Sequence, residues 1–256
     1  MEIRELIDKL CEKYPLDFQE DWDNSGLQIG NLDNELKNVL ISLDLEEEGV
    51  DIAIKNDCNL IITHHPYLFN GTKSIDFTDK FYNRLEKVIK NDISVFAMHT
   101  NLDIATDGLN DNLCQILDIQ KAQVLELDKD LGLGRYGEIE KTKAKDFAMR
   151  VKEILKANEL VCYGDMEKEI TKVAVCGGAG SSLFDDAISQ ECDLMITGDV
   201  SYHMGMDYAN RGLVIIDPGH FASENHVIYK LENVINEMTN NKVYTYSKED
   251  YFRTFI

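Results

Sequence analysis

Basic side chains are scarce in this chain of 256 residues: 26 lysines and arginines stand against 47 aspartates and glutamates, for a formal net charge of -21. No stretch combines clustered Lys and Arg with aromatic residues. Because binding to nucleic acid depends largely on cationic contacts with phosphates, this composition disfavours a nucleic-acid partner. The acidic excess suits solubility and the binding of cations better.

Long apolar runs are also lacking. No run of about 18 apolar residues occurs, as a membrane-spanning helix would need, and Glu2, Arg4 and Glu5 stand where a signal peptide would be apolar. We therefore expect a soluble, cytoplasmic protein without a membrane partner. The chain has only 16 glycines and 3 prolines against 44% hydrophobic residues, which is the composition of a folded globular protein.

The cysteines form no CxxC pair. They are widely spaced, and most lie in apolar stretches: Cys11, Cys58, Cys114, Cys162, Cys176 and Cys192. This pattern predicts reduced, buried thiols rather than a disulfide framework or a thiolate zinc site.

Short apolar runs alternate with helical patterns, which predicts an α/β fold with mostly parallel sheets. The expected strands are 39–43, 60–63, 95–98, 173–176 and 214–216, and the expected helices are 46–56, 79–90, 108–117 and 144–155. The alternation breaks between Lys121 and Tyr163, where the glycine-rich turn Gly132–Gly137 lies. We therefore expect domains at 1–125 and 126–256, with the C-terminal segment either in the second domain or returning to pack on the first.

A weak internal repeat supports two related units. The segment Ala53–Thr63 aligns with Ala187–Thr197, and Asp103–Asp107 aligns more weakly with His220–Glu224. Both matches keep their order along the chain. They predict two related α/β units that pack against each other, with similarity by chance between βα units as the alternative.

Side chains that can bind metal follow the predicted strands. The set comprises His64 and His65 after strand 60–63, His99 and Asp103 after strand 95–98, and His220 and Glu224 after strand 214–216. Ligands of open α/β sheets bind beyond the carboxyl ends of the strands. Imidazoles together with carboxylates are typical of zinc, manganese or iron, and five ligands besides His99 favour two ions bridged by a carboxylate. The alternative is a chance His-His dipeptide with acids that favour helix N-termini.

Four sequence blocks occur in order: Asp21–Gly30, Thr63–Pro66, His99–Asp103 and Gly219–Glu224. Together they resemble the GTP cyclohydrolase 1 type 2 homologue family. The resemblance implies two α/β domains with a two-metal site in the cleft between them, and assembly into a ring-shaped homohexamer. It implies metal binding by five residues: His64, His65, Asp103, His220 and Glu224. The chain lacks the domain that some members insert between the halves.

Other residues have less certain roles in the sequence. His99 and His203 are candidates for support of the metal ligands or for proton transfer, with a purely structural role as the alternative for His203. Arg135 is a candidate to bind a substrate phosphate, and Trp22 and Asn24 are candidates for substrate binding; each could equally be part of a solvated turn. The turn Gly177–Ser181 lacks the endings of a P-loop and of a GxGxxG motif, although it could still bind an anion.

These features favour a metal-dependent hydrolase that acts through a metal-activated water on a nucleotide, a cyclic amide or a phosphoester. The sequence does not rank these substrates, and no Ser/His/Asp or Cys/His arrangement is evident. Two alternatives stay open. One is a non-enzymatic, hexameric metal-binding scaffold or metal-trafficking protein, and the other is a nucleotide-binding regulator that uses the turn Gly177–Gly180.

Overall fold

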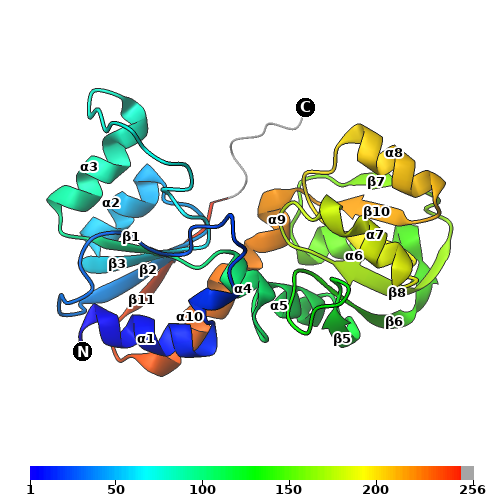
Figure 1. Cartoon of the computed structure of the whole chain (residues 1–256), viewed down its shortest axis with the longest axis horizontal. Coiled ribbons are helices and arrows are strands. Elements are labelled where there is room, and N and C mark those ends of the chain that lie inside the picture. Colours follow the sequence, from blue (N-terminus) through cyan, green and yellow to red (C-terminus); the bar gives the residue numbers. More distant parts are fainter. Residues whose placement is uncertain (249–256) are drawn as a thin grey trace. The chain divides into compact units, whose positions relative to one another are not determined.

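A computed structural model describes residues 1–248, and these residues form two compact units (Figure 1). Unit 1 comprises Met1–Leu102 with Ile228–Lys248, and unit 2 comprises residues 103–227. The expected boundary after residue 125 therefore lies later than the observed one. Residues 103–125 belong to unit 2 because β5 (Gln120–Val124) pairs with β6 (Arg135–Lys143).

Unit 1 contains a five-stranded sheet in the order β1-β4-β3-β2-β11. Its strands are β1 (Gly26–Ile29), β2 (Asn38–Ser42), β3 (Cys58–Thr63), β4 (Ser94–Ala97) and β11 (Val243–Tyr246). All neighbours are parallel except β1, which pairs with β4 in the antiparallel direction. The carboxyl ends of β2, β3 and β4 therefore meet at one edge of the sheet.

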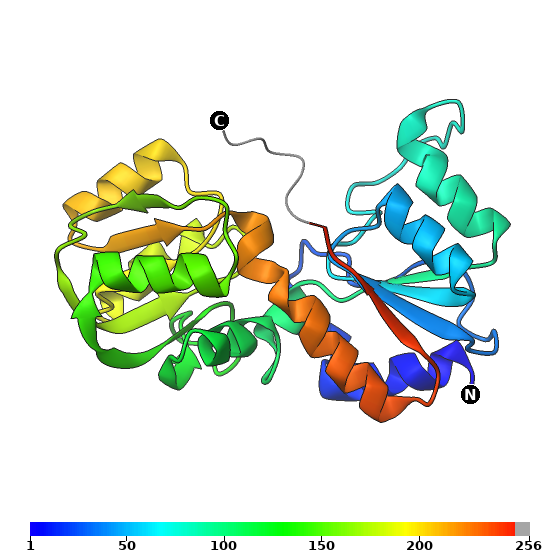
Figure 2. The same ribbon diagram turned by 180° about the vertical axis from the view of Figure 1, so that it is seen from behind.

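Helices cover both faces of this sheet (Figures 1 and 2). The set comprises α1 (Ile3–Lys13), α2 (Glu47–Lys55), α3 (Asn83–Lys90), which follows the 3-10 turn η2 (Lys80–Tyr82), and α10 (His226–Met238), which crosses the unit boundary. Val50 of α2 and Val88 of α3 pack in one buried cluster with Ile61 of the sheet. The apolar strands and the apolar stripes of these helices thus bury each other, which fixes the strand ends in place.

Unit 2 contains a six-stranded sheet in the order β5-β6-β8-β9-β10-β7. The additional strands are β7 (Val161–Tyr163), β8 (Glu169–Val175), β9 (Leu194–Ile196) and β10 (Val214–Asp217). The strands β8, β9 and β10 are parallel, whereas β5, β6 and β7 pair in the antiparallel direction. The α/β fold is confirmed, with a mixed sheet in this unit.

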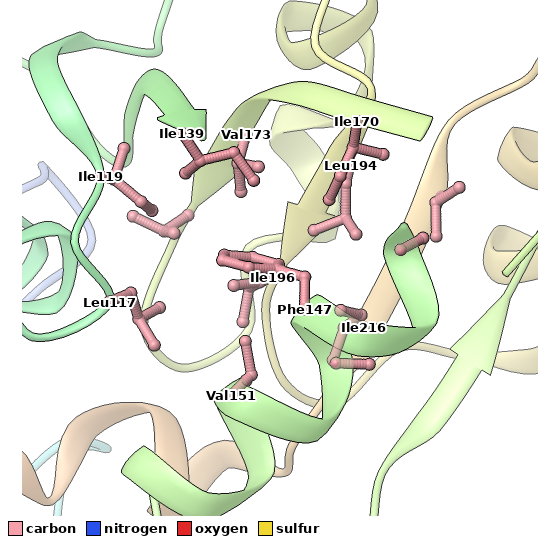
Figure 3. Close-up of a cluster of buried hydrophobic side chains, with 14 of the residues drawn as sticks. Leu117, Ile119, Ile139, Phe147, Val151, Ile170, Val173, Leu194, Ile196 and Ile216 are labelled. Atoms are coloured by element: carbon pink, nitrogen blue, oxygen red, sulfur yellow. The ribbon is translucent and has the colours of Figure 1, made fainter. Parts of the chain in front are cut away.

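One of two buried hydrophobic clusters in unit 2 lies between α6 (Ala144–Ile154) and the sheet, as Figure 3 shows. Phe147 and Val151 of α6 pack against Val173, Leu194 and Ile216, each from a different strand. The remaining helices of unit 2 are α5 (Leu109–Ile116), η3 (Ser181–Leu183), α7 (Phe184–Ser189), α8 (Tyr202–Asn210) and α9 (His220–Glu224). Unit 1 also contains the 3-10 turn η1 (Leu16–Phe18), and α4 (Thr100–Ile104) crosses the unit boundary.

The repeat seen in the sequence corresponds to a repeated structure. In unit 1 three parallel strands occur in the order β2, β3, β4, and in unit 2 the same arrangement occurs as β8, β9, β10. The aligned residues Asp57 and Glu191 precede β3 and β9, and both adopt a left-handed backbone with φ of 52° and 56°. Such a backbone is uncommon for residues other than glycine, so its recurrence indicates related units.

All six cysteines are free thiols, and Cys58, Cys114, Cys176 and Cys192 are buried as expected. Cys162 differs from the expectation because it is exposed on β7, at the edge of the sheet of unit 2. In the part of the chain that the structure describes, no helix is both long enough and apolar enough to cross a membrane.

Candidate metal centre

Three histidines of unit 1 meet at the carboxyl edge of its sheet. His64 and His65 follow β3, and His99 follows β4, which is parallel to β3. One ring nitrogen from each lies within 4.8 Å of the others. The group is therefore compact enough for its members to bind a metal ion.

In both His64 and His65, the ring nitrogen Nδ1 lies close to an oxygen that can accept a hydrogen bond. Nδ1 of the buried His64 lies 2.7 Å from the carbonyl oxygen of Met98, and Nδ1 of His65 lies 2.9 Å from Oδ1 of Asp44, beyond the end of β2. A carbonyl or an ionised carboxylate can only accept, so Nδ1 carries the proton and Nε2 presents a lone pair. Metal-ligating histidines are held in this way in most proteins.

His99 is held by a buried carboxylate. Its Nδ1 lies 2.7 Å from Oδ1 of Asp23, whose side chain has no exposed surface. Oδ2 of Asp23 accepts from the hydroxyl of Ser25 and from the backbone and hydroxyl of Thr100. Burial alone would raise the pKa of Asp23, but the hydrogen bonds from His99 and Thr100 outweigh it and hold that pKa well below its ordinary value.

In unit 2, His220 and Glu224 form a pair within α9. Nε2 of His220 lies 3.1 Å from Oε2 of Glu224, and its Nδ1 lies 2.7 Å from Oδ2 of Asp199. Asp199 follows β9 and adopts a left-handed backbone with φ of 55°. Strained backbones of this kind are concentrated at functional sites. Here the conformation accompanies a carboxylate that orients His220.

Glycines make room for the Glu224 carboxylate. Gly178 has a φ of +66°, and a side chain on it would overlap Oε1 of Glu224. Asp103 is also buried in this unit, and burial together with the charges of Asp103 and Glu224 raises the pKa of the Cys176 thiol. The cysteine is therefore a neutral thiol beside the carboxylates rather than a thiolate ligand.

This donor set fits a divalent metal ion. Two ligand atoms bound tetrahedrally to zinc at about 2.0 to 2.1 Å lie about 3.3 Å apart, and the atoms of the His220–Glu224 pair are 3.1 Å apart. His64, His65, His99 and His220 all have Nδ1 near an oxygen acceptor. At His226 both ring nitrogens face groups that are not candidate ligands, the side chain of Asn112 and the carbonyl oxygen of Ser223, whereas Nε2 of His220 faces Glu224, itself a candidate ligand.

The positions of Arg135 and His203 do not support the roles predicted for them. Arg135 is buried, and its three nitrogens donate to Asp111 and to the carbonyl oxygens of Gly132, Gly134, Ile104 and Ala105. These bonds account for its guanidinium without a substrate phosphate, and its burial also excludes the solvated turn. His203 is exposed on α8, beside the ring of Tyr202.

The two candidates near the N-terminus lie in unit 1 beside His99. The ring of Trp22 lies 6.0 Å from that of His99, and Trp22 is 58% exposed. The side-chain amide of Asn24 donates to the carbonyl oxygen of Leu68 at 2.7 Å. Trp22 is therefore available to a ligand, whereas Asn24 holds the loop after β3.

The glycine-rich turn after β8 uses its amides inside the protein. Gly177 donates to Asn110, Gly178 donates to Ser223, and Gly180 donates to Thr197. A phosphate-binding turn instead directs its N–H groups at the ligand. This hydrogen bonding weakens the nucleotide-regulator alternative and gives the turn a different part, which is to shape the space around Glu224.

The acceptors behind the histidines were not predicted. Asp44 and Asp199 carry the sequence signal that identified the ligands, since each follows a strand. Asp23 lies in a recognised block but had no specific role assigned. Which histidine each carboxylate contacts depends on how separate strands lie in the fold. The sequence alone does not show this.

The histidines and carboxylates beyond the strand ends of these two α/β units define a protein with side chains that could bind a metal ion. The chain belongs to the Duf34/NIF3 (NGG1p interacting factor 3) family, whose model matches residues 1–250. The family resemblance found in the sequence motifs is thereby confirmed.

Named relatives support this assignment. A protein of Clostridium acetobutylicum called GTP cyclohydrolase 1 type 2 homolog is 35% identical over 247 residues, covering 93% of this chain and 92% of the relative. One from Methanocaldococcus jannaschii with the same name is 32% identical over 226 residues, covering 88% and 90%. The crystal structure of a Bacillus cereus protein related to NIF3 matches with a TM-score of 0.94 at 26% identity, covering 100% of this chain and 99% of that one.

Proposed function

We propose that this protein binds two divalent metal ions and uses them as a hydrolase. The proposed ligands are His64, His65, Asp103, His220 and Glu224. The observation that carries the proposal is the shared orientation of the histidines, each with Nδ1 near an oxygen acceptor. At His64 and His65 this arrangement favours the tautomer in which Nε2 can bind a metal. At His220, Nε2 faces the carboxylate of Glu224, the other proposed ligand of unit 2.

Zinc, iron or manganese bound by these side chains would polarise a carbonyl or phosphoryl oxygen and lower the pKa of a water molecule to about 7. The imidazoles would hold the ions, and the carboxylates of Asp103 and Glu224 would balance their charge. His99, held by Asp23, lies beside His64 and His65 and can accept or donate a proton there. The substrate classes that this chemistry serves are nucleotides, cyclic amides and phosphoesters.

The experiment combines metal analysis with a substrate screen. Chelator-free protein is reconstituted with zinc, iron or manganese in turn, and its metal content and its turnover of nucleotides, cyclic amides and phosphoesters are measured. Substitution of a ligand in either unit, His65→Ala or Glu224→Gln, should lower the metal content and abolish turnover while the circular dichroism spectrum stays unchanged. Metal binding without turnover of any substrate would contradict the hydrolase and favour the scaffold.

We also propose that the chain assembles into a ring-shaped homohexamer, as the family resemblance implies. The proposal is independent of the metal chemistry. Light scattering coupled to size-exclusion chromatography should give a mass about six times the 29.2 kDa of one chain. A monomer at micromolar concentration would contradict it.

A further inference from the structure

Three aromatic rings of unit 1 meet at a corner beside the metal-ligand candidates. The ring centroids of Trp22 and Phe69 lie 6.0 Å apart, and His99 lies 6.0 Å from Trp22 and 6.2 Å from Phe69. The three interplanar angles are 70°, 78° and 88°. The three rings therefore stand steeply inclined to one another. We call this group of Trp22, Phe69 and His99 the aromatic corner.

Two of these rings are exposed although they are apolar. Trp22 is 58% exposed and Phe69 is 45% exposed. Their loops are nevertheless tied together: Nε2 of Gln28 donates to the carbonyl oxygen of Asn24 at 2.7 Å, and its Oε1 accepts from the backbone N–H of Leu68 at 3.1 Å. A buried glutamine thus ties together the two loops that carry the exposed aromatic rings, which indicates a built binding surface.

His99 connects this corner to the metal-ligand candidates. Its ring centroid lies 5.3 Å from that of His64 and 5.6 Å from that of His65. A small molecule bound against Trp22 and Phe69 would therefore be separated from the proposed metal ligands His64 and His65 only by the ring of His99. That position suits the part of a substrate that is held while a neighbouring bond reacts.

We propose that Trp22, Phe69 and His99 form a subsite for a planar heteroaromatic ring of the nucleobase class. Such a ring can stack on one face of the corner while its edge meets the face of another, the two arrangements that aromatic pairs favour. Glu20 and Asp21 adjoin Trp22, and the chain carries a net charge of -21, so a neutral ring is favoured over a polyphosphate. The inference deepens the proposed function and rests on it for the identity of the ring as part of a substrate.

Trp22 is the only tryptophan in the chain, so its fluorescence reports on this corner alone. Metal-loaded protein is titrated with guanosine as the heteroaromatic probe and with ribose 5-phosphate as a probe that lacks the ring. Guanosine should quench Trp22 saturably, and ribose 5-phosphate should not. Calorimetry under the same conditions gives an affinity that does not depend on the fluorophore.

Paired substitutions distinguish the contribution of the aromatic ring to binding from that of the size of the side chain. Phe69→Leu should weaken guanosine binding about 5- to 150-fold, since base–aromatic stacking is worth about 1 to 3 kcal/mol per base, whereas Phe69→Tyr should retain it. Trp22→Leu and Trp22→Phe, measured by calorimetry, should differ in the same way. Tyr202→Leu is the matched control, because Tyr202 is 67% exposed but lies in unit 2 outside the corner.

Three results would overturn the inference. These are the absence of saturable quenching by guanosine, equal quenching by ribose 5-phosphate, and binding that Phe69→Leu leaves unchanged in a folded protein. Metal content is measured on the same samples. Protein that binds guanosine through Trp22 and Phe69 but holds no metal would contradict the proposed hydrolase and leave the aromatic subsite standing.

Discussion

Nδ1 of His99 lies 2.7 Å from Oδ1 of Asp23, a carboxylate whose side chain is completely buried. This relationship joins the first recognised sequence block, Asp21–Gly30, to the loop that follows β4. The same arrangement occurs between His65 and Asp44, and in unit 2 between His220 and Asp199. Histidines held by carboxylates are therefore a repeated feature of both units.

The first prediction concerns acid stability. Because the pKa of Asp23 is lowered in the folded protein, its contribution to the free energy of unfolding is fully present above about pH 4, the ordinary pKa of an aspartate. It is lost as the pH falls below that value. Asp23→Asn should destabilise the protein by about 1 to 3 kcal/mol at neutral pH and flatten the dependence of stability on pH below 4. Urea unfolding at several pH values measures both effects, and an unchanged slope in acid would contradict the account of Asp23.

The second prediction concerns the carboxylates that orient the histidines. Asp44→Asn and Asp199→Asn should each lower metal affinity about 10- to 100-fold, since partners of this kind tune their ligands to that extent. Asp57→Asn is the control because Asp57 forms an exposed ion pair with Lys37, away from the candidate site. Competition with a fluorescent chelator gives the affinities. Equal affinities in all three variants would mean that the carboxylates have no effect on metal binding.

The third prediction uses two glycines that share a left-handed backbone. Gly178→Ala should lower metal affinity, because the added methyl group would overlap Oε1 of Glu224. Gly212, with φ of +94°, has nothing near the position of a Cβ atom. Both variants should lose about 1 to 2 kcal/mol of stability from backbone strain. If Gly212→Ala reduced metal affinity as much as Gly178→Ala did, the effect would come from general destabilisation.

The fourth prediction concerns the thiols. Burial raises the pKa of Cys58 and Cys114 to about 12 and that of Cys192 to about 11, so these residues hold little thiolate near neutral pH. Cys162 is exposed. A thiol reagent should therefore modify Cys162 first in the folded protein, and Cys162→Ser should remove this fast phase. Fast modification of the buried thiols in that variant would contradict the burial pattern.

The sequence predicted the fold where strands are apolar and flanked by clear helices. The segments around Leu40, Ile61 and Val95 became β2, β3 and β4 because each is buried on both faces of a parallel sheet. The strands β1, β5, β6, β7 and β11 escaped prediction. In β1 the apolar residues alternate with Gly26 and Gln28, and in β6 the exposed Glu138 and Glu140 alternate with buried positions, so neither segment forms the continuous apolar run by which the other strands were predicted.

Local context could identify the candidate metal-binding residues, because a histidine or an acid after a strand is visible in a linear sequence. It could not identify the aromatic corner. Phe69 lies far along the chain from Trp22, and the hydrogen bonds of Gln28 and Asn24 show that their loops are held together. For the same reason, Arg135 resembled a substrate-binding residue until its carbonyl partners were visible.

Binding of two metal ions per chain underlies the whole proposed function. It can be measured by elemental analysis of protein purified without chelators, and again after incubation with zinc, iron and manganese. We expect about two ions per chain, and a lower content in both His65→Ala and Glu224→Gln. Metal content near zero after all three incubations, in protein that is folded by circular dichroism, would contradict it.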